Sequence, residues 1–154
     1  MIELPTLTLP TEADTAALAQ RIAPLLRAGD AILLAGPIGA GKSAFARALI
    51  RSRLGNPSED VPSPTFTVVQ TYQAEDVEIW HCDLYRLSST QEVFELGLDE
   101  AFVQAICLIE WPDRLGNLAP DGALLLTFAA HDAHHSVAFS GTGRWSRTLE
   151  SVFA

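Results

Sequence analysis

The sequence of 154 residues is poor in the side chains on which nucleic-acid binding and disulfide frameworks depend. It has ten Lys and Arg residues against nineteen Asp and Glu, a net charge of −9, and its single lysine is Lys42. Because nucleic-acid binding relies on basic side chains that neutralise phosphates, this charge argues against a domain that holds nucleic acid by itself. The two cysteines, Cys82 and Cys107, lie far apart in apolar, strand-like runs without CxxC spacing, so we expect them to be reduced, buried and structural.

The chain also lacks a long apolar run and a leader-like start. No stretch resembles a transmembrane span, and residues 1–5 have neither the basic beginning nor the apolar core of a signal peptide. We therefore expect a cytoplasmic protein that is not associated with a membrane. The length is that of one domain, predicted to occupy residues 1–154, and the chain shows no internal repeat or low-complexity segment.

The most informative stretch is an apolar run, residues 31–35, that leads directly into Gly36-Pro37-Ile38-Gly39-Ala40-Gly41-Lys42-Ser43. This is the GxxxxGKS pattern of a phosphate-binding P-loop, with a strand before it and a helical pattern after it. Its glycines let successive backbone N–H groups point to one spot, and the helix that begins near Lys42 adds the positive end of its dipole. We predict that Lys42 reaches the β- and γ-phosphates of a nucleoside triphosphate and that the Ser43 hydroxyl ligates Mg²⁺. The alternative is a Gly-rich turn that happens to carry a lysine.

Helical spacing appears both before and after this motif. A short strand at residues 6–9 is followed by Thr11, predicted as an N-cap with Asp14, and by apolar residues at helical spacing until Gly29. The start of this helix is a candidate neighbour of the nucleotide base. On the helix after the motif, Arg47 and Arg51 share one face. That face is either a docking patch or a solvated surface, and we favour the solvated surface.

The middle of the chain reads as a hairpin and two short helices. Residues 65–72 and 77–82 are β-branched and aromatic, and only four residues separate them, too few for a parallel crossover. We therefore predict an antiparallel hairpin attached to the nucleotide-binding sheet. Residues 89–92 form a full capping-box pattern that begins a helix ended by Gly97, and a second helical turn is predicted at 99–103.

The remaining strands complete the fold class. The continuous apolar run 105–109 predicts a buried central strand, residues 123–128 and 136–140 predict a second hairpin, and the tail 144–153 has weak helical spacing. We predict an α/β, P-loop NTPase-like three-layer fold. Its central sheet is mostly parallel, with added antiparallel strands and flanking helices.

Two carboxylates follow strands at the edge where the P-loop opens. Glu110 follows the central run, and Asp83 ends the preceding strand, with His81 on the same side and Cys82 in the core. Together with Ser43 they supply oxygen ligands for Mg²⁺, and Glu110 is either a ligand or the group that polarises the attacking water. The alternatives are a glutamate that merely ends a strand and a structural His81–Asp83 pair.

Two further segments carry polar groups. In Ser63-Pro64-Thr65 the prolines restrict the backbone, and Thr65 offers a hydroxyl and an N–H that would sense a γ-phosphate, as switch loops do. The alternative is an ordinary loop bounded by prolines. His131, His134 and His135 lie near no second metal-ligand pattern, so we do not expect a zinc site.

Four blocks stand in a characteristic order: 36–43, then SPTFT at 63–67, HCDLYRL at 81–87 and LIEWP at 108–112. Their order and spacing resemble the TsaE (YjeE-type) family of small bacterial P-loop ATPases, required for making threonylcarbamoyladenosine at position 37 of tRNAs. The resemblance extends from about Thr6 to Phe128. It implies a P-loop core with added antiparallel strands and an ATPase that is weak by itself and works with TsaB and TsaD. It further implies that TsaD transfers the threonylcarbamoyl group, that hydrolysis resets the complex, and that the partners contact most of the tRNA.

The resemblance also implies roles for individual residues. Ser43 and Glu110 would be Mg²⁺ ligands, Lys42 the phosphate lysine, and Asp83 a further acidic group near the metal. Residues 63–66 would be the switch-like loop, and Thr11 and Glu12 would lie beside the nucleotide base. The chain departs from the family where Ser43 replaces the more frequent threonine, which keeps the hydroxyl. It also departs in the loop after Phe128, which is rich in histidine where many relatives carry a basic residue near the nucleotide, and the resemblance assigns no role to His134 or His135.

Two other functions compete with an accessory ATPase. A small-molecule kinase would use the same P-loop but would need a basic lid, for which only Arg86 and Arg114 lie near the relevant strand ends. A nucleotide-gated binding module would use ATP occupancy alone to order residues 63–67 for a partner.

Overall fold

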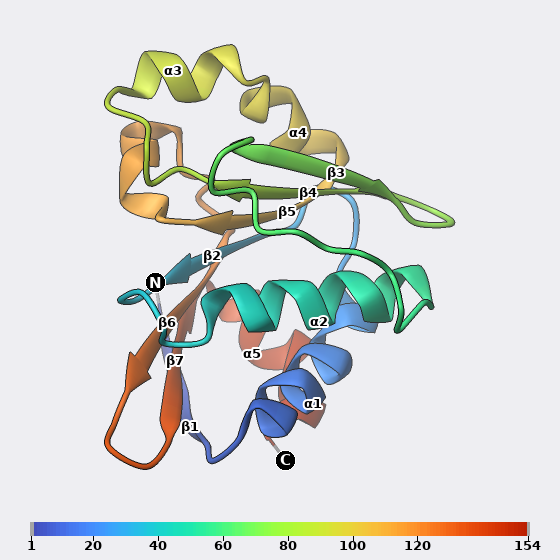
Figure 1. Ribbon diagram of the computed structural model, residues 1–154, viewed down its shortest axis with the longest axis vertical. Helices are drawn as coiled ribbons and strands as arrows, with labels where there is room; N and C mark the ends of the chain where they lie inside the picture. Colours follow the sequence, from blue (N-terminus) through green and yellow to red (C-terminus); the bar gives the residue numbers. More distant parts are fainter. Residues whose placement is uncertain (1, 154) are drawn as a thin grey trace.

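Seven strands form one sheet in the computed structural model, which describes residues 2–153 (Figure 1). In the order in which they lie side by side, the strands are β1 (Ile2–Leu9), β7 (His135–Gly141), β6 (Leu124–Ala130), β2 (Ala31–Ala35), β5 (Ile106–Glu110), β4 (Glu78–Asp83) and β3 (Val69–Gln73). The α-helices are α1 (Glu12–Ile22), α2 (Lys42–Leu54), α3 (Thr90–Glu95), α4 (Leu98–Gln104), α5 (Gly143–Thr148) and α6 (Glu150–Phe153). Two 3₁₀ segments are also present: η1 (Ala23–Leu25) lies between α1 and β2, and η2 (Pro112–Leu118) lies between β5 and β6.

The centre of the sheet is parallel and both of its sides are antiparallel. Strand β2 pairs in parallel with β5 and β6, and β5 pairs in parallel with β4. Hairpins extend this centre, β3 with β4 on one side and β6 with β7 on the other, and β1 pairs antiparallel with β7. Within residues 2–153, three of six pairings are therefore parallel, fewer than the predicted mostly parallel sheet. Both predicted hairpins are confirmed.

Helices cover both faces of the sheet (Figure 1). Alternate residues of the central strands point to opposite faces, as the pleat requires. Leu34 and Leu108 belong to a core shared with α1, α2 and the C-terminal helices, whereas Cys107 and Ile109 belong to a core shared with α3, α4 and η2. Strand β5 is covered on both faces and all five of its residues are buried, which explains why the four residues before Glu110 are all apolar.

The predicted boundaries of two N-terminal elements are wrong. The first strand begins at Ile2 rather than Thr6. The capping box of Thr11 and Asp14 is confirmed, but α1 ends at Ile22 and continues only as η1. Pro24 lies in this 3₁₀ turn, and because proline has no N–H it does not extend an α-helix.

Two predictions in the middle of the chain also need correction. The strand predicted from Thr65 begins only at Val69, because the chain turns before it: Val68 has a left-handed backbone (φ 69°) and its N–H donates to the Pro64 carbonyl. The capping box at Ser89 is half formed. Its hydroxyl accepts from the Glu92 N–H, but the Glu92 carboxylate accepts from the Ser88 hydroxyl and N–H instead of returning to Ser89.

The solvated face favoured for Arg47 and Arg51 is wrong, because both residues are half-buried. Arg47 donates to the Val61 carbonyl and Arg51 to the Glu59 carbonyl. These bonds fasten the segment that follows α2 to the helix itself. Both guanidinium groups therefore help to hold the protein's own loop in place.

Both cysteines are free and buried, as predicted. Burial raises the pKa of the Cys107 thiol to about 12 and raises the pKa of Cys82 well above its usual range. The helices described within residues 2–153 include none long and apolar enough to cross a membrane.

Candidate functional site

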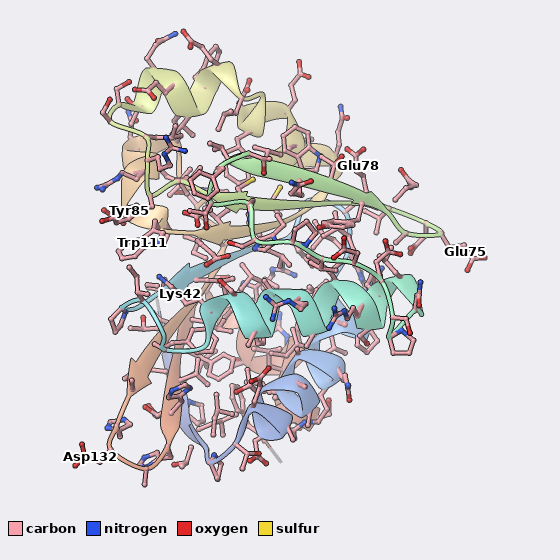
Figure 2. All side chains as sticks on the ribbon, in the orientation of Figure 1. Lys42, Glu75, Glu78, Tyr85, Trp111 and Asp132 are labelled. Atoms are coloured by element: carbon pink, nitrogen blue, oxygen red, sulfur yellow. The ribbon has the colours of Figure 1, made fainter. Side chains whose placement is uncertain are left out.

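A cavity of about 570 Å³ opens at the carboxyl edge of the parallel strands. Its wall is formed by the loop before α2 and the first turn of that helix, by the ends of β4 and β5, and by residues of α1 and β7. Open α/β sheets place ligands outside the carboxyl ends of their strands. Figure 2 shows Lys42, Tyr85 and Trp111 gathered at this edge, whereas Glu75 and Asp132 lie at the distant tips of the two hairpins.

The loop between β2 and α2 depends on glycine. Gly36 has a φ of 129°, and a Cβ there would collide with the Phe128 carbonyl oxygen, so a side chain does not fit. Gly41, with a φ of 108°, is the N-cap of α2 and supplies no side-chain cap. The first turn of α2 therefore reaches the cavity with N–H groups that no capping side chain occupies, an arrangement suited to an anion.

Lys42 is only 5% exposed although it lines the cavity. Its Nζ donates to the Gly36 carbonyl at 2.7 Å and lies 3.8 Å from the centre of the Trp111 ring. Trp111 in turn packs against Tyr85, with 4.9 Å between ring centres. Burial lowers the pKa of Lys42, and the nearby charges of Glu110, Asp83 and Asp113 partly oppose this effect. The ammonium group is thus held at the cavity by a carbonyl and a ring, neither of which neutralises it.

Glu110 is held between two elements. Its Oε1 accepts from the Ser43 hydroxyl at 3.0 Å, and its Oε2 lies 2.8 Å from His81 Nε2. The side chains of His81 and Glu110 are 2% and 3% exposed. The predicted placement of His81 on the same side of β4 as Asp83, with Cys82 in the opposite core, is confirmed by these contacts and by the burial of Cys82 among the α3–α4 side chains.

Asp83 accepts hydrogen bonds from two other segments, the residues directly after β4 and the loop that contains Thr65. Its Oδ1 accepts from the Tyr85 N–H at 3.1 Å, and its Oδ2 accepts from the Thr65 hydroxyl at 3.3 Å. The Thr65 hydroxyl also lies 2.8 Å from that of Ser63. The loop predicted to be switch-like therefore contacts a strand-end carboxylate through Thr65.

Residues of α1 and β7 complete the lining of the cavity. Glu12 and Thr15 of α1 line it together with His135 of β7, whose Nδ1 would lie 3.4 Å from a Cβ on Gly41. Thr11 lies outside this cavity and lines a smaller adjoining one of about 210 Å³, together with Glu12 and His135. His131 and His134 stack on one another in the β6–β7 turn, with 4.6 Å between ring centres.

The predicted site residues divide into two groups. Those that line the cavity are Glu12, Ile38, Gly39, Gly41, Lys42, Ser43, Thr65, Asp83 and Glu110. Of the others, Ala40 is buried in the core, and Gly36 and Pro37 line a neighbouring apolar groove of about 390 Å³ that shares Trp111 with the cavity. Gly36 nevertheless serves the cavity through its carbonyl.

Several cavity residues were not predicted from the sequence as site residues. Tyr85 and Trp111 each stand one or two positions after a strand-end carboxylate, and that position was the available signal. Thr15 and His135 come from α1 and the second hairpin, and nothing in their local sequence indicates a site. Only the fold brings them there.

The donor set of the cavity is chemically specific. A hydroxyl from Ser43 and carboxylates from Glu110 and Asp83 line one wall, close to the free N–H groups of α2. Carboxylate, hydroxyl and water oxygens are the ligands that Mg²⁺ prefers, and it commonly binds through one or two carboxylates and the phosphates of a substrate. These residues therefore fit a phosphate-bound Mg²⁺ ion.

Comparison with known proteins is decisive for the family. The family model described as "Threonylcarbamoyl adenosine biosynthesis protein TsaE" matches residues 9–137. The chain belongs to the TsaE family. The TsaE protein of Rickettsia conorii is 42% identical over 111 residues, covering 72% of this chain and 63% of that protein, so the match leaves more than a third of the relative's length uncovered. The TsaE protein of Bacillus subtilis is 33% identical over 132 residues, covering 84% of this chain and 81% of that protein.

A solved structure agrees with this family membership. The crystal structure of YdiB from Bacillus subtilis superposes with a TM-score of 0.80 at 26% identity, covering 99% of this chain and 96% of that one. The TsaE resemblance inferred from the four sequence blocks is thereby confirmed as family membership.

Proposed function

We propose that this TsaE-family chain binds Mg-ATP in the 570 Å³ cavity and hydrolyses it slowly, as an accessory subunit in the threonylcarbamoyladenosine modification of tRNA. The observation that carries the proposal is the convergence of Lys42, Ser43, Glu110 and Asp83 on one cavity at the start of α2. The curated relatives are named tRNA threonylcarbamoyladenosine biosynthesis proteins, which supports the process. The parallel strand order around β2 and the Gly-rich loop support a P-loop NTPase-like fold.

The chemistry divides among a few side chains. Lys42 would leave the Gly36 carbonyl and the Trp111 ring and stabilise negative charge on the β- and γ-phosphates. Ser43, Glu110 and Asp83 would hold Mg²⁺, which neutralises phosphate charge when bound. In the alternative role, Glu110 would accept a hydrogen bond from the attacking water. Thr65, already bonded to Asp83, would report γ-phosphate occupancy to its own loop.

The proposed partners are the TsaB and TsaD proteins. Two apolar side chains support a partner close to the cavity: Ile38 in the Gly-rich loop is 80% exposed, and Phe66, next to Thr65, is 82% exposed. The net charge of −9 supports the proposal that tRNA is contacted mainly through the partners rather than by this chain.

Phosphate release from Mg-ATP tests the proposal, measured for the purified chain alone and then with TsaB and TsaD. We expect slow release that rises when the partners are added. A rate that ignores the partners would contradict the accessory role, and absence of release in every mixture would contradict ATP hydrolysis. Full support of tRNA modification by a non-hydrolysable ATP analogue over many turnovers would instead establish the nucleotide-gated module.

The kinase alternative finds less support in the structure. Arg114 donates to the Tyr85 carbonyl and pairs with Asp113, and the Arg86 guanidinium lies 5.4 Å from the centre of the Phe66 ring. Neither arginine lines the cavity, so the basic lid that clamps a transferred phosphoryl group is not assembled from them. An acceptor screen in which ATP is consumed without phosphate release would reverse this preference.

A further inference from the structure

We propose that His81 is a positioning residue that fixes the Glu110 carboxylate against the Ser43 hydroxyl and so controls the cation-dependent part of nucleotide binding. The inference rests on the proposed Mg-nucleotide site and adds to it a residue that does not line the cavity. His81 lies on β4, whereas Glu110 is the last residue of β5 and Ser43 is in the first turn of α2. The contact chain therefore joins three separate elements of the site.

The geometry gives each carboxylate oxygen of Glu110 one protein partner. Oε1 accepts from Ser43 Oγ at 3.0 Å and Oε2 lies 2.8 Å from His81 Nε2. In the parallel ladder Asp83 is the register partner of Glu110 and His81 that of Leu108, so His81 reaches Glu110 diagonally on one face. Ser43 alone would leave the carboxylate free to turn about its last torsion, and the contact from β4 removes that freedom.

Burial assigns the proton of this contact. His81 is 1% exposed, and its Nδ1 is buried without a hydrogen-bond partner among the described residues. A hydrogen on Nδ1 would be a buried donor with no acceptor, which is costly. The geometry therefore points to the tautomer that carries its hydrogen on Nε2, where the Glu110 oxygen accepts it.

Asp83 does not depend on this histidine. Its two oxygens accept from the Tyr85 N–H and the Thr65 hydroxyl, both close to it along the chain or in the facing loop. A change at His81 is therefore expected to disturb Glu110 and spare Asp83. Hydrogen bonds to metal-binding side chains typically account for 10- to 100-fold in metal affinity.

Two substitutions separate the hydrogen bond from the volume it fills. His81→Phe keeps a ring in the buried space but has no donor, whereas His81→Gln keeps an N–H donor at a reach comparable to Nε2. The measurement is the affinity for a fluorescent ADP analogue with and without Mg²⁺, together with Mn²⁺ binding followed by electron paramagnetic resonance. We expect His81→Phe to keep the metal-free nucleotide affinity and to weaken Mn²⁺ binding in the nucleotide complex by about 10- to 100-fold. His81→Gln is expected to restore most of that loss.

The chain offers a matched control in His131. It lies exposed on the β6–β7 turn, where its Nε2 bonds the Ser136 hydroxyl at 2.9 Å, and His131→Phe and His131→Gln should leave Mn²⁺ binding unchanged. If His81→Phe does not fold, His81→Asn takes its place, because its shorter amide occupies the Nδ1 position and does not reach Glu110. The same loss is then expected.

Three results would overturn the inference. One is parental Mn²⁺ affinity in the folded His81→Phe or His81→Asn protein, and another is failure of His81→Gln to recover it. The third is an additional loss when His81→Phe is combined with Glu110→Gln, because a residue that acts only through Glu110 has nothing left to position. If the parent protein binds no nucleotide at all, the proposed function fails first, and that outcome is visible before any variant is made.

Discussion

The two ends of helix α2 carry cationic side chains that serve different purposes. At its start, Lys42 donates to the carbonyl of the Gly-rich loop and lines the cavity, where we propose that a nucleotide phosphate replaces this acceptor. At its end, Arg53 donates to the carbonyls of Ala23 and Leu26, which belong to the turn after α1. The role of a basic side chain on a helix therefore depends on which groups accept its hydrogen bonds. The spacing of residues in the sequence does not reveal those groups.

The difference follows from the helix itself. The start of α2 presents N–H groups without a capping side chain, which favours a negative ligand, and under the proposed function Lys42 would bind the same ligand. The end of α2 presents carbonyls, capped by the N–H of Gly55 with a φ of 67°, and it favours cations. Arg53 fits this end, where its side chain is 14% exposed and also pairs with Asp76. The proposed function therefore assigns a ligand to one end of α2, whereas the other end makes contacts within the protein.

The largest expected effect is on the rate of phosphate release and comes from a substitution at the start of α2. Lys42→Ala removes the charge proposed to stabilise the transferring phosphate, and we expect phosphate release in the assembled complex to fall by about 100-fold or more, roughly 3 kcal/mol. Thermal unfolding serves as the control and should show a folded protein. Parental turnover by this variant would mean that Lys42 is not part of the catalytic machinery.

The next largest effect is on stability and comes from a substitution at the C-terminal end of α2. Arg53→Met keeps much of the aliphatic stem but leaves the Ala23 and Leu26 carbonyls without their charged donor. Hydrogen bonds to charged groups contribute about 1.5–3 kcal/mol, so we expect a loss of roughly 2 kcal/mol in the free energy of unfolding, measured with urea. Nucleotide affinity should not change. An unchanged unfolding midpoint would show that water replaces the guanidinium without cost.

A smaller effect is expected two residues earlier, at Arg51. Arg51→Met removes one hydrogen bond from a charged donor, from Nε to the Glu59 carbonyl at 2.9 Å, and should cost about 1.5 kcal/mol, the lower end of the same range. Stimulation of ATP hydrolysis by TsaB and TsaD should remain parental, because this guanidinium is engaged with the protein's own loop. Loss of stimulation without loss of stability would restore the docking patch that the spacing of Arg47 and Arg51 left open.

The same contrast explains what was and was not predictable from the sequence. The motif around Lys42 was recognisable from the sequence because P-loops have a fixed spacing of glycine, lysine and hydroxyl residues. The carboxylates Asp83 and Glu110 were recognisable because each directly follows a strand-like run. His135 was not predicted as a cavity residue, because the family resemblance pointed to its loop without assigning it a role, and only the fold shows that it lines the cavity. The strand predicted from Thr65 failed for a local reason, since the left-handed turn at Val68 has no glycine or asparagine to announce it.

The smallest effect concerns the stability lost by burying the charged Lys42 side chain. Burial lowers its pKa below the ordinary value of 10.5, so the folded protein holds this proton less tightly than the unfolded chain. The favourable contribution of this ionisation to stability is then present above pH 10.5 and is lost as pH falls through the folded pKa. At pH 7, Lys42→Met should therefore unfold no earlier than the parent, and as pH rises toward 10.5 the parent should gain stability relative to the variant. Arg53→Met, examined over the same pH range, should remain less stable than the parent throughout. If Lys42→Met instead lost stability at pH 7 as Arg53→Met does, the contacts with Gly36 and Trp111 would outweigh desolvation, and both ends of α2 would contribute to the framework.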